Sequence, residues 1–361
     1  MAREAVLGIT ERARSILVSS PNSLDEAIAQ AIDEAYETSQ GLAQSVEATL
    51  AGEVRSALSG YGQLDDLIAN PAIEEIWINA PDQFFIFENS KTRRLDLNLT
   101  ALDVRQAVER MLRDSGRRLD RSEPFVDATL LNGSRLHVVI PDVTREHWSV
   151  NIRKFPTKVY SLEDLVLLGS MSQAMAGFLS EQFRHGINIL VSGATQAGKT
   201  TMLCALLNVG HLSERLVSVE ETFEIRTNYV DWVALQARQA NLEGVGEITL
   251  RRLVKEALRM RPSRLVIGEV RQAEALDLLI ALNSGIAGLC TIHANSAFDA
   301  LEKLKLLPLL AGENIPSLFV SQTVERTIGL VVHCEMDSSG KRRVAQVIQS
   351  KGIETWIEVN L

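Results

Sequence analysis

The sequence predicts an α/β protein with two folded units, and three observations lead to this prediction. The chain has 361 residues, which is long for one hydrophobic core, since domains usually hold about 100 to 200 residues. From Ser161 onwards, helical patterns alternate with near-continuous apolar strands, which is typical of a mainly parallel sheet covered by helices. Between Gly60 and Phe155 the strands are shorter and rich in β-branched and aromatic residues, which favours a separate α+β unit.

We therefore expect four segments along the chain. They are an N-terminal helical extension over 1–59, a smaller α+β domain over 60–155, a linker over 156–160 and a larger α/β domain over 161–361. The extension is predicted from the capping-box pattern Ser23-Leu24-Asp25-Glu26, which precedes apolar residues at helical spacing. A second helix is expected from Ala43 to Leu58.

The strands and helices of the two domains follow from short sequence patterns. In the first domain, strands are expected at 73–79 and 83–88, with Pro81-Asp82 forming a hairpin turn between them. A helix at 101–113 and strands at 135–140 and 148–155 complete this domain, and Pro156-Thr157-Lys158 is expected to form the linker. In the second domain, buried strands are expected at 187–193, 215–221, 264–270 and 289–295.

Composition excludes several classes of protein. The formal net charge of −9 offers no broad basic surface, so nucleic acid is not the favoured partner. No uncharged apolar run approaches the ~20 residues that span a bilayer, and charged residues interrupt any signal-peptide core near the N-terminus. We therefore expect a cytoplasmic protein without a transmembrane segment.

Cys204, Cys290 and Cys334 lie far apart in apolar surroundings and are expected to be buried thiols.

The most informative motif is a phosphate-binding loop, or P-loop. The sequence fits GxxxxGK[ST] between an apolar strand and a predicted helix, which is the context this motif requires. The glycines allow a tight turn that brings backbone N–H groups onto phosphate oxygens at the positive end of a helix. We expect the nucleotide-binding residues to be Gly193, Ala194, Thr195, Gln196, Ala197, Gly198, Lys199, Thr200 and Thr201.

Two of these side chains have specific predicted roles. Lys199 is expected to reach the β- and γ-phosphates of ATP, and the Thr200 hydroxyl is expected to bind Mg²⁺, a hard cation that prefers oxygen ligands. A P-loop alone does not separate kinases, switches and motors, so other motifs must choose among them.

Polar residues close three further predicted strands. Glu269 follows the aliphatic run Arg264–Gly268, as expected of a Walker B acid beside magnesium. His293 lies in Thr291–Asn295, and Glu220, Glu221 and Glu224 follow the strand after the P-loop helix. Since ligands bind beyond the carboxyl ends of parallel strands, we expect these clusters to converge on the P-loop.

Taken together, these segments resemble the secretion superfamily ATPases, and most closely the CpaF/TadA-type ATPases of tight-adherence pili. The resemblance lies in GATQAGKTT, VSVEETFEIR, LRMRPSRLVIGEVRQAEALD and GLCTIHANSAFDALEKL, and continues into PFVDATLLNGSRLHVVIP and VNIRKF. It covers residues 55 to 340 and implies a RecA-like P-loop ATPase domain after the smaller N-terminal domain. It also implies a homohexameric ring that uses ATP and Mg²⁺ and docks on an inner-membrane platform protein.

The resemblance also assigns roles to residues. Glu220, Glu221 and Glu224 match an acidic box whose glutamate polarises the attacking water, and we favour Glu220. Glu269 matches the Walker B position and His293 the family's histidine box. Two departures stand out, since the acidic box has Glu-Glu instead of the commoner Glu-Asp, and Leu289-Cys290 replaces small hydroxyl residues.

Arginines are a further set of candidates, because guanidinium groups neutralise the charge of a transferring phosphoryl group. The family resemblance favours arginines of the first domain and of the Arg238 region, and we expect Arg135 and Arg153 to sense the γ-phosphate. Surface salt bridging is the alternative for the other arginines in suitable positions, which are Arg238, Arg259, Arg261 and Arg271.

Three alternatives to a pilus-assembly motor stay open. The first is a conjugative or type IV secretion ATPase, which shares the same motifs. The second is a nucleotide-dependent switch, although the Asn-Lys-x-Asp motif of guanine switches does not occur. The third is a DNA-binding motor, which the acidic composition disfavours.

Overall fold

The structure is a computed structural model that describes residues 2–19, 24–38, 51, 54, 60–97, 99–115, 117–155, 159–210, 213–240 and 244–361. The chain divides into two compact units, Met1–Pro156 and Thr157–Leu361. The predicted capping residue Ser23, most of the helix expected at 43–58 and the linker tripeptide at 156–158 lie outside the described residues.

Two helices open the chain. Helices α1 (Ala2–Ser19) and α2 (Leu24–Thr38) pack together through small and β-branched side chains. Because these apolar residues recur at helical spacing, each helix buries one face against the other. The buried residues include Ile9, Ala13, Ile16, Ala27, Ile28, Ala31 and Ile32.

Most of the other described residues of the first unit belong to an antiparallel sheet with helices. Its strand order is β3-β2-β1-β6-β5-β4, and the helices are α4 (Leu64–Ala69) and α5 (Ala101–Ser115). The predicted hairpin is confirmed as β1 (Ile73–Ala80) and β2 (Gln83–Glu88). Strands β5 (Arg135–Val139) and β6 (Ser149–Arg153) were also expected, whereas β3 (Lys91–Leu95) and β4 (Phe125–Thr129) were not.

Alternation along these strands gives the sheet two different faces. One face packs into a core that includes Ile76, Phe84, Leu136 and Ile152 together with Met111 of α5. The other face is half-exposed and carries the stacked rings of Trp77 and Phe85, whose centroids are 5.9 Å apart. Arg135 and Arg153 lie on this second face, opposite one another on β5 and β6.

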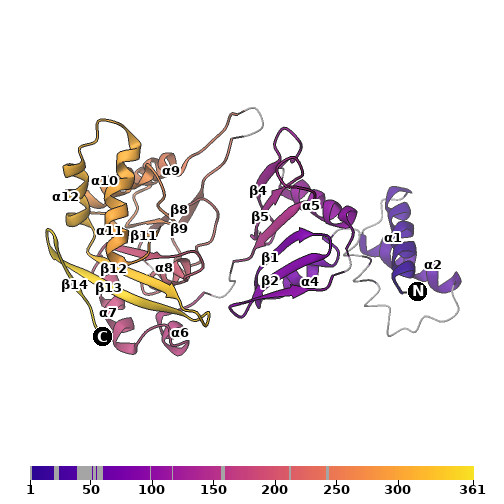
Figure 1. Ribbon diagram of the computed structural model, residues 1–361, viewed down its shortest axis with the longest axis horizontal. Coiled ribbons are helices and arrows are strands. Elements are labelled where there is room, and N and C mark those ends of the chain that lie inside the picture. Colours follow the sequence, from indigo (N-terminus) through magenta and orange to yellow (C-terminus); the bar gives the residue numbers. More distant parts are fainter. Residues whose placement is uncertain are drawn as a thin grey trace. The chain divides into compact units, whose positions relative to one another are not determined.

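The second unit contains an eight-stranded sheet in the order β14-β13-β12-β7-β11-β10-β8-β9. The parallel strands are β7 (Ile189–Gly193), β8 (Leu216–Glu220), β9 (Trp232–Gln236), β10 (Arg264–Ile267), β11 (Ala287–His293) and β12 (Leu330–Met336). Strands β13 (Arg342–Gly352) and β14 (Thr355–Glu358) are antiparallel additions at one edge, drawn in yellow in Figure 1. The mainly parallel sheet was predicted, but the parallel strands β9 and β12 and the antiparallel edge were not.

Helices cover both faces of this sheet. Helices α6 (Leu162–Leu167), α7 (Gln173–Arg184) and α8 (Lys199–Leu207) share one core with alternate strand residues such as Ile189 and Val191. The opposite core includes Leu190 and residues of α9 (Leu250–Ala257), α10 (Glu274–Asn283), α11 (Ala297–Leu306) and α12 (Ser317–Thr327). Two 3-10 segments, η2 (Leu258–Met260) and η3 (Leu307–Ala311), follow α9 and α11.

Two sequence expectations can be checked directly on this fold. Cys204, Cys290 and Cys334 are buried free thiols, as expected. Within the described ranges, no helix combines the length and the apolar character needed to cross a membrane.

Candidate nucleotide-binding site

Four neighbouring strands of the second unit bring the predicted residues to one edge of the sheet. Strands β7, β11, β10 and β8 lie side by side and run parallel, so their carboxyl ends share that edge. The P-loop follows β7, His293 ends β11, Glu269 follows β10 and Glu220 ends β8. Ligands bind beyond this edge in parallel α/β sheets.

The P-loop connects β7 to α8, which begins at Lys199. Its backbone has positive φ at Gly193, Gln196 and Gly198. A Cβ atom at Gly193 would lie 2.3 Å from the carbonyl oxygen of Cys334, so only glycine fits where the loop leaves the sheet. The free N–H groups of the first turn of α8 can bond phosphate oxygens. Of the other loop residues, Ala194 and Thr195 are exposed, Ala197 is buried and Thr201 is half-buried.

Lys199 lies at the centre of a polar cluster. Its side chain is 8% exposed, and its Nζ donates to the carbonyl oxygen of Ala194 at 2.9 Å. The same Nζ lies 3.2 Å from Nδ1 of His293. A lysine ammonium only donates, so Nδ1 accepts and the neutral imidazole carries its proton on Nε2.

Glu269 lies on the other side of His293. Its Oε1 is 2.8 Å from His293 Nε2, and its Oε2 accepts from Arg271 at 2.6 Å. A carboxylate oxygen has two lone pairs, so the buried Oε1 keeps at least one for a further ligand. Burial raises the pKa of Glu269, but the contacts with His293 and Arg271 outweigh it and hold the pKa at about 2. Glu269 is therefore a carboxylate at neutral pH and can bind a cation.

Glu220 has the opposite electrostatic character. It is 2% exposed, and its Oε1 accepts the backbone N–H groups of Glu224 and Ile225, both at 2.8 Å. Its Oε2 is buried without a hydrogen-bond partner among the described residues. Burial raises its pKa to about 7, and the two backbone donors oppose this only in part. A carboxyl group with a pKa near neutrality is suited to accept a proton from water.

The other two acids of the predicted box are placed differently. Glu224 is half-buried, and its Oε2 accepts from the Thr200 hydroxyl at 3.3 Å. Glu221 is exposed. Burial therefore distinguishes Glu220 from its neighbours, which the run of acids in the sequence could not do.

The donor set at this edge fits Mg²⁺ and a nucleotide phosphate. Thr200, Glu224 and Glu269 supply the oxygen atoms that this cation prefers. The spare lone pair on Glu269 Oε1 and the glycine cradle at Gly193 are features that a bound ion and a phosphate would use.

The predicted sensor arginines lie in the first unit, on strands β5 and β6. Arg135 donates to Asp127 at 3.0 Å, and the Arg153 guanidinium lies 5.8 Å from the ring of Phe155. Among the other candidates, Arg271 joins the site through Glu269. Arg238 donates to the carbonyl oxygen of Gly246 and Arg259 pairs with Glu256, and both are local contacts. Arg261 has a left-handed backbone conformation at the end of η2.

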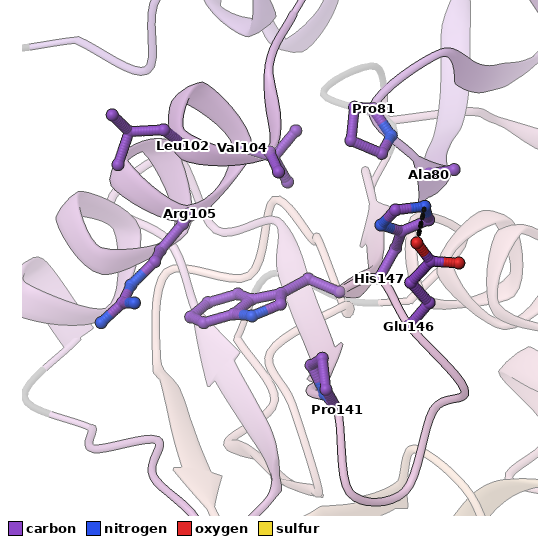
Figure 2. Close-up of a pocket in the computed structure, with 10 residues that line it drawn as sticks. Ala80, Pro81, Leu102, Val104, Arg105, Pro141, Glu146 and His147 are labelled. Atoms are coloured by element: carbon purple, nitrogen blue, oxygen red, sulfur yellow. Dashed lines mark ion pairs between the residues drawn. The ribbon is translucent and has the colours of Figure 1, made fainter.

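Two features of the structure were not anticipated from the sequence. Ser192, the residue before the P-loop, lies 2.9 Å from Nδ1 of His333 on β12, and both side chains are buried. The continuous apolar run Leu330–Val332 before His333 could have indicated a buried strand, but not its place beside β7. The first unit also contains a hollow of about 330 Å³ around Trp148 and Arg105 (Figure 2), which includes none of the predicted site residues.

Comparison with known proteins identifies related sequences. The family described as type II/IV secretion system protein matches residues 57–357. The putative conjugal transfer protein Rv3659c of Mycobacterium tuberculosis is 34% identical over 302 residues, which cover 81% of this chain and 85% of that protein. The type IV secretion system protein VirB11 of Bartonella quintana is 26% identical, with 81% of this chain and 93% of that protein covered.

Solved structures share the fold. The ATPase DotB of Yersinia pseudotuberculosis has a TM-score of 0.58 and 14% identity, covering 78% of this chain and 76% of that one. The pilus retraction motor PilT with bound ADP has a TM-score of 0.55 and 15% identity, with 83% of each chain covered. The predicted fold class, an α/β RecA-like domain with a smaller N-terminal domain, is confirmed. Because the family match spans most of the sequence and a relative is 34% identical across 81% of it, the chain belongs to the type II/IV secretion system protein family.

Proposed function

We propose that the chain hydrolyses ATP to ADP and phosphate and uses the free energy to drive a secretion or pilus-assembly machine. The observation that carries this proposal is the meeting of the P-loop, Glu220, Glu269 and His293 at the carboxyl edge of four adjacent parallel strands. A switch or simple binding module needs the P-loop but has no need of a buried carboxyl group with a pKa near 7.

The residues divide the chemistry among them. The P-loop N–H groups and Lys199 hold the β- and γ-phosphates, and Thr200 with Glu269 holds Mg²⁺ directly or through water. When bound, Mg²⁺ neutralises charge on the phosphate oxygens. Glu220 accepts a proton from the water that attacks the γ-phosphorus, while the bond from that phosphorus to the β-phosphate oxygen breaks. His293 keeps Lys199 and Glu269 in place by contacting both.

Arg135 and Arg153 are proposed to sense the γ-phosphate from the first unit. A guanidinium group bonds two phosphate oxygens at once and stays charged at any working pH. Loss of the γ-phosphate would remove much of that attraction, and only such a differential interaction shifts a conformational equilibrium. Hydrolysis would thereby be converted into movement between the units.

The assembly proposed is a homohexameric ring in the cytoplasm, held at the inner membrane by a platform protein. Its support is the family membership together with the absence of a membrane-spanning helix among the described residues. The division of the chain at residues 1–59, 60–155, 156–160 and 161–361 belongs to the same proposal.

A second candidate for the machine that the ATPase drives is a conjugative or type IV secretion system. It is favoured by the names of relatives, which include conjugal transfer proteins of Mycobacterium tuberculosis and Sinorhizobium fredii. Tight-adherence pilus assembly is favoured by the motif segments quoted above. Deleting the gene and measuring piliation and plasmid transfer separately would distinguish a pilus-assembly ATPase from a conjugative one.

The test of the proposed function is phosphate release by the purified chain and by a Lys199→Ala variant. Lys199 supplies charge to the site, so the variant should keep its fold and lose at least about a hundredfold in hydrolysis. Lys351→Ala, an exposed lysine on β13, is the matched control and should retain full activity. If Lys199→Ala hydrolyses ATP at the parent rate, the proposed site is wrong.

A further inference from the structure

The hairpin formed by β12 and β13 contacts the P-loop at its start. In the parallel register of β7 and β12, His333 lies beside Ser192 and Cys334 lies beside Gly193. The Ser192–His333 hydrogen bond and the close approach of the Cys334 carbonyl to Gly193 both occur here. The start of the P-loop is therefore packed against β12.

The same hairpin contacts the P-loop near its end through Arg342, the first residue of β13. Arg342 Nε donates to the carbonyl oxygen of Gln196 at 2.8 Å. Its aliphatic stem covers Gly198, because a Cβ atom built there would lie 3.5 Å from Arg342 Cδ. One side chain thus contacts two residues of the loop, one by a charged donor and one by packing.

The hydrogen bond from Arg342 is made to the loop residue whose backbone conformation is unfavourable. Gln196 has φ of 62°, in the left-handed region that residues with a Cβ atom seldom adopt. Such a conformation persists when surrounding groups hold it, and a donor from a charged guanidinium is among the stronger hydrogen bonds available. With the carbonyl of Gln196 bonded to Arg342, that oxygen is directed to the guanidinium and not towards a bound phosphate.

We propose that Arg342 is a positioning residue that holds the P-loop in its phosphate-binding conformation. This inference rests on the proposed nucleotide function. Arg342 acts through Gln196 and Gly198, so its contribution is the same for any ligand that places phosphates in the loop. ADP and ATP should depend on it equally, and a loss of uniform binding raises KM with little change in kcat.

The adjacent residue provides a matched control. Arg343 has the same charge on the same strand, but it is exposed and pairs with Glu335 at 3.5 Å. Arg342→Met removes the donor and keeps most of the stem on Gly198, whereas Arg342→Lys keeps the charge and one donor group. Arg343→Met makes the same chemical change beside the loop.

The experiment measures affinity for Mg·ADP and Mg·ATP with fluorescent nucleotides, together with KM and kcat for hydrolysis and melting without nucleotide. Arg342→Met should weaken both affinities by about tenfold and raise KM similarly, since one charge-assisted hydrogen bond is lost. Its kcat should stay within about twofold of the parent. Arg342→Lys should be intermediate, and Arg343→Met should match the parent. If Arg342→Met does not fold, the comparison of Arg342→Lys with Arg343→Met decides the question.

Three results would overturn the proposal. Equal affinities of Arg342→Met and Arg343→Met would show that the loop does not need this contact. A loss confined to ATP would assign Arg342 to direct γ-phosphate contact, and a fall in kcat at unchanged affinity would assign it to the chemical step. Failure of the proposed function is a separate outcome, because the parent protein itself would then fail to bind or to hydrolyse the nucleotide.

Discussion

Replacing Glu220 by glutamine should stabilise the fold above pH 7 and remove hydrolysis. The carboxyl group is 2% exposed, and burial raises its pKa to about 7 from an ordinary value of 4.5. Glutamine keeps the shape and an oxygen that can accept the N–H groups of Glu224 and Ile225. The glutamine side chain is uncharged, so the variant does not carry the free-energy cost of ionising a buried carboxyl group.

The sign of the effect follows from the direction of the shift. A raised pKa means that the folded chain binds the proton more tightly than the unfolded chain, so the free energy of unfolding falls as pH rises from 4.5 to about 7. At about 1.4 kcal/mol per pH unit, the loss is about 3 kcal/mol and stays constant above pH 7. The protonated carboxyl and the amide are similar, so parent and variant should differ little near pH 4.5.

Urea unfolding of parent and variant between pH 5 and pH 8 measures this difference. The stability of Glu220→Gln relative to the parent should increase by about 2 to 3 kcal/mol over that range. Glu221→Gln, at the exposed neighbouring acid, should change stability by less than about 0.5 kcal/mol at either pH. Parallel pH curves for parent and Glu220→Gln would refute the argument that a buried, ionisable group lies here.

The same variant tests the chemistry. Glu220→Gln should bind Mg·ATP with parental affinity and hydrolyse it poorly, because the amide cannot accept the proton of the attacking water. Normal turnover would move the base to Glu221 or Glu224. A variant that is stabilised at pH 8 and fully active would separate the electrostatic argument from the catalytic one and retain only the first.

Two further predictions concern the arginines and the assembly. Arg135→Ala and Arg153→Ala should leave ADP affinity nearly unchanged and weaken ATP affinity and hydrolysis about tenfold or more, whereas Arg93→Ala on the edge strand should have no effect. Equal losses for ADP and ATP would indicate a structural salt bridge. Light scattering with Mg·ATP should report a closed ring, since head-to-tail contacts either close or continue as filaments. A monomer at working concentration with nucleotide present would contradict this.

The strand-end site could be predicted because each part has a local signal. The P-loop shows its own motif, and Glu269 and His293 each follow an apolar strand. Parallel strands put their carboxyl ends at one edge, so the meeting of these residues required only that the sheet be parallel. The predicted strand over 264–270 was too long, because β10 ends at Ile267 and Glu269 lies in the segment after it. The strand over 289–295 likewise ends at His293.

Other features depend on contacts between distant segments and had no local signal. The sequence does not show that β12 lies beside β7 or that β13 and β14 extend the sheet in the antiparallel sense. Arg264 illustrates the same limit, since an arginine at the start of an aliphatic strand was expected only as part of the run before Glu269. It is 1% exposed, with its guanidinium 3.8 Å from the centre of the Phe183 ring and a contact to Glu214. Only the tertiary partners make burial of that charge possible.

The choice among the three acids shows how strand geometry resolves what a motif leaves open. Glu220 is the last residue of β8, and alternation along the strand turns its side chain towards the core that contains Ile225 and Cys204. Its Cγ would lie 3.0 Å from a Cβ atom at Gly268, so the backbone of the neighbouring strand end packs directly against it. Glu221, one residue later, is exposed. Two adjacent glutamates therefore differ in environment, since Glu220 is buried with a pKa of about 7 and Glu221 is an exposed surface acid.

The placement of Arg135 and Arg153 gives a physical reason to expect an anion at the polar face of the first unit. The two residues are directly opposite on β5 and β6, and like charges in that position repel. Nearby acids offset the repulsion, because Asp127 accepts from Arg135 and Glu75 lies opposite Arg153 on β1. Both carboxylates are half-exposed, so their attraction to the guanidinium groups is weak and solvent-screened. A polyanion such as a triphosphate could displace both carboxylates and bind the two guanidinium groups at once. A diphosphate carries less charge and would do so less well. Replacing either arginine should therefore lower the affinity for ATP more than the affinity for ADP.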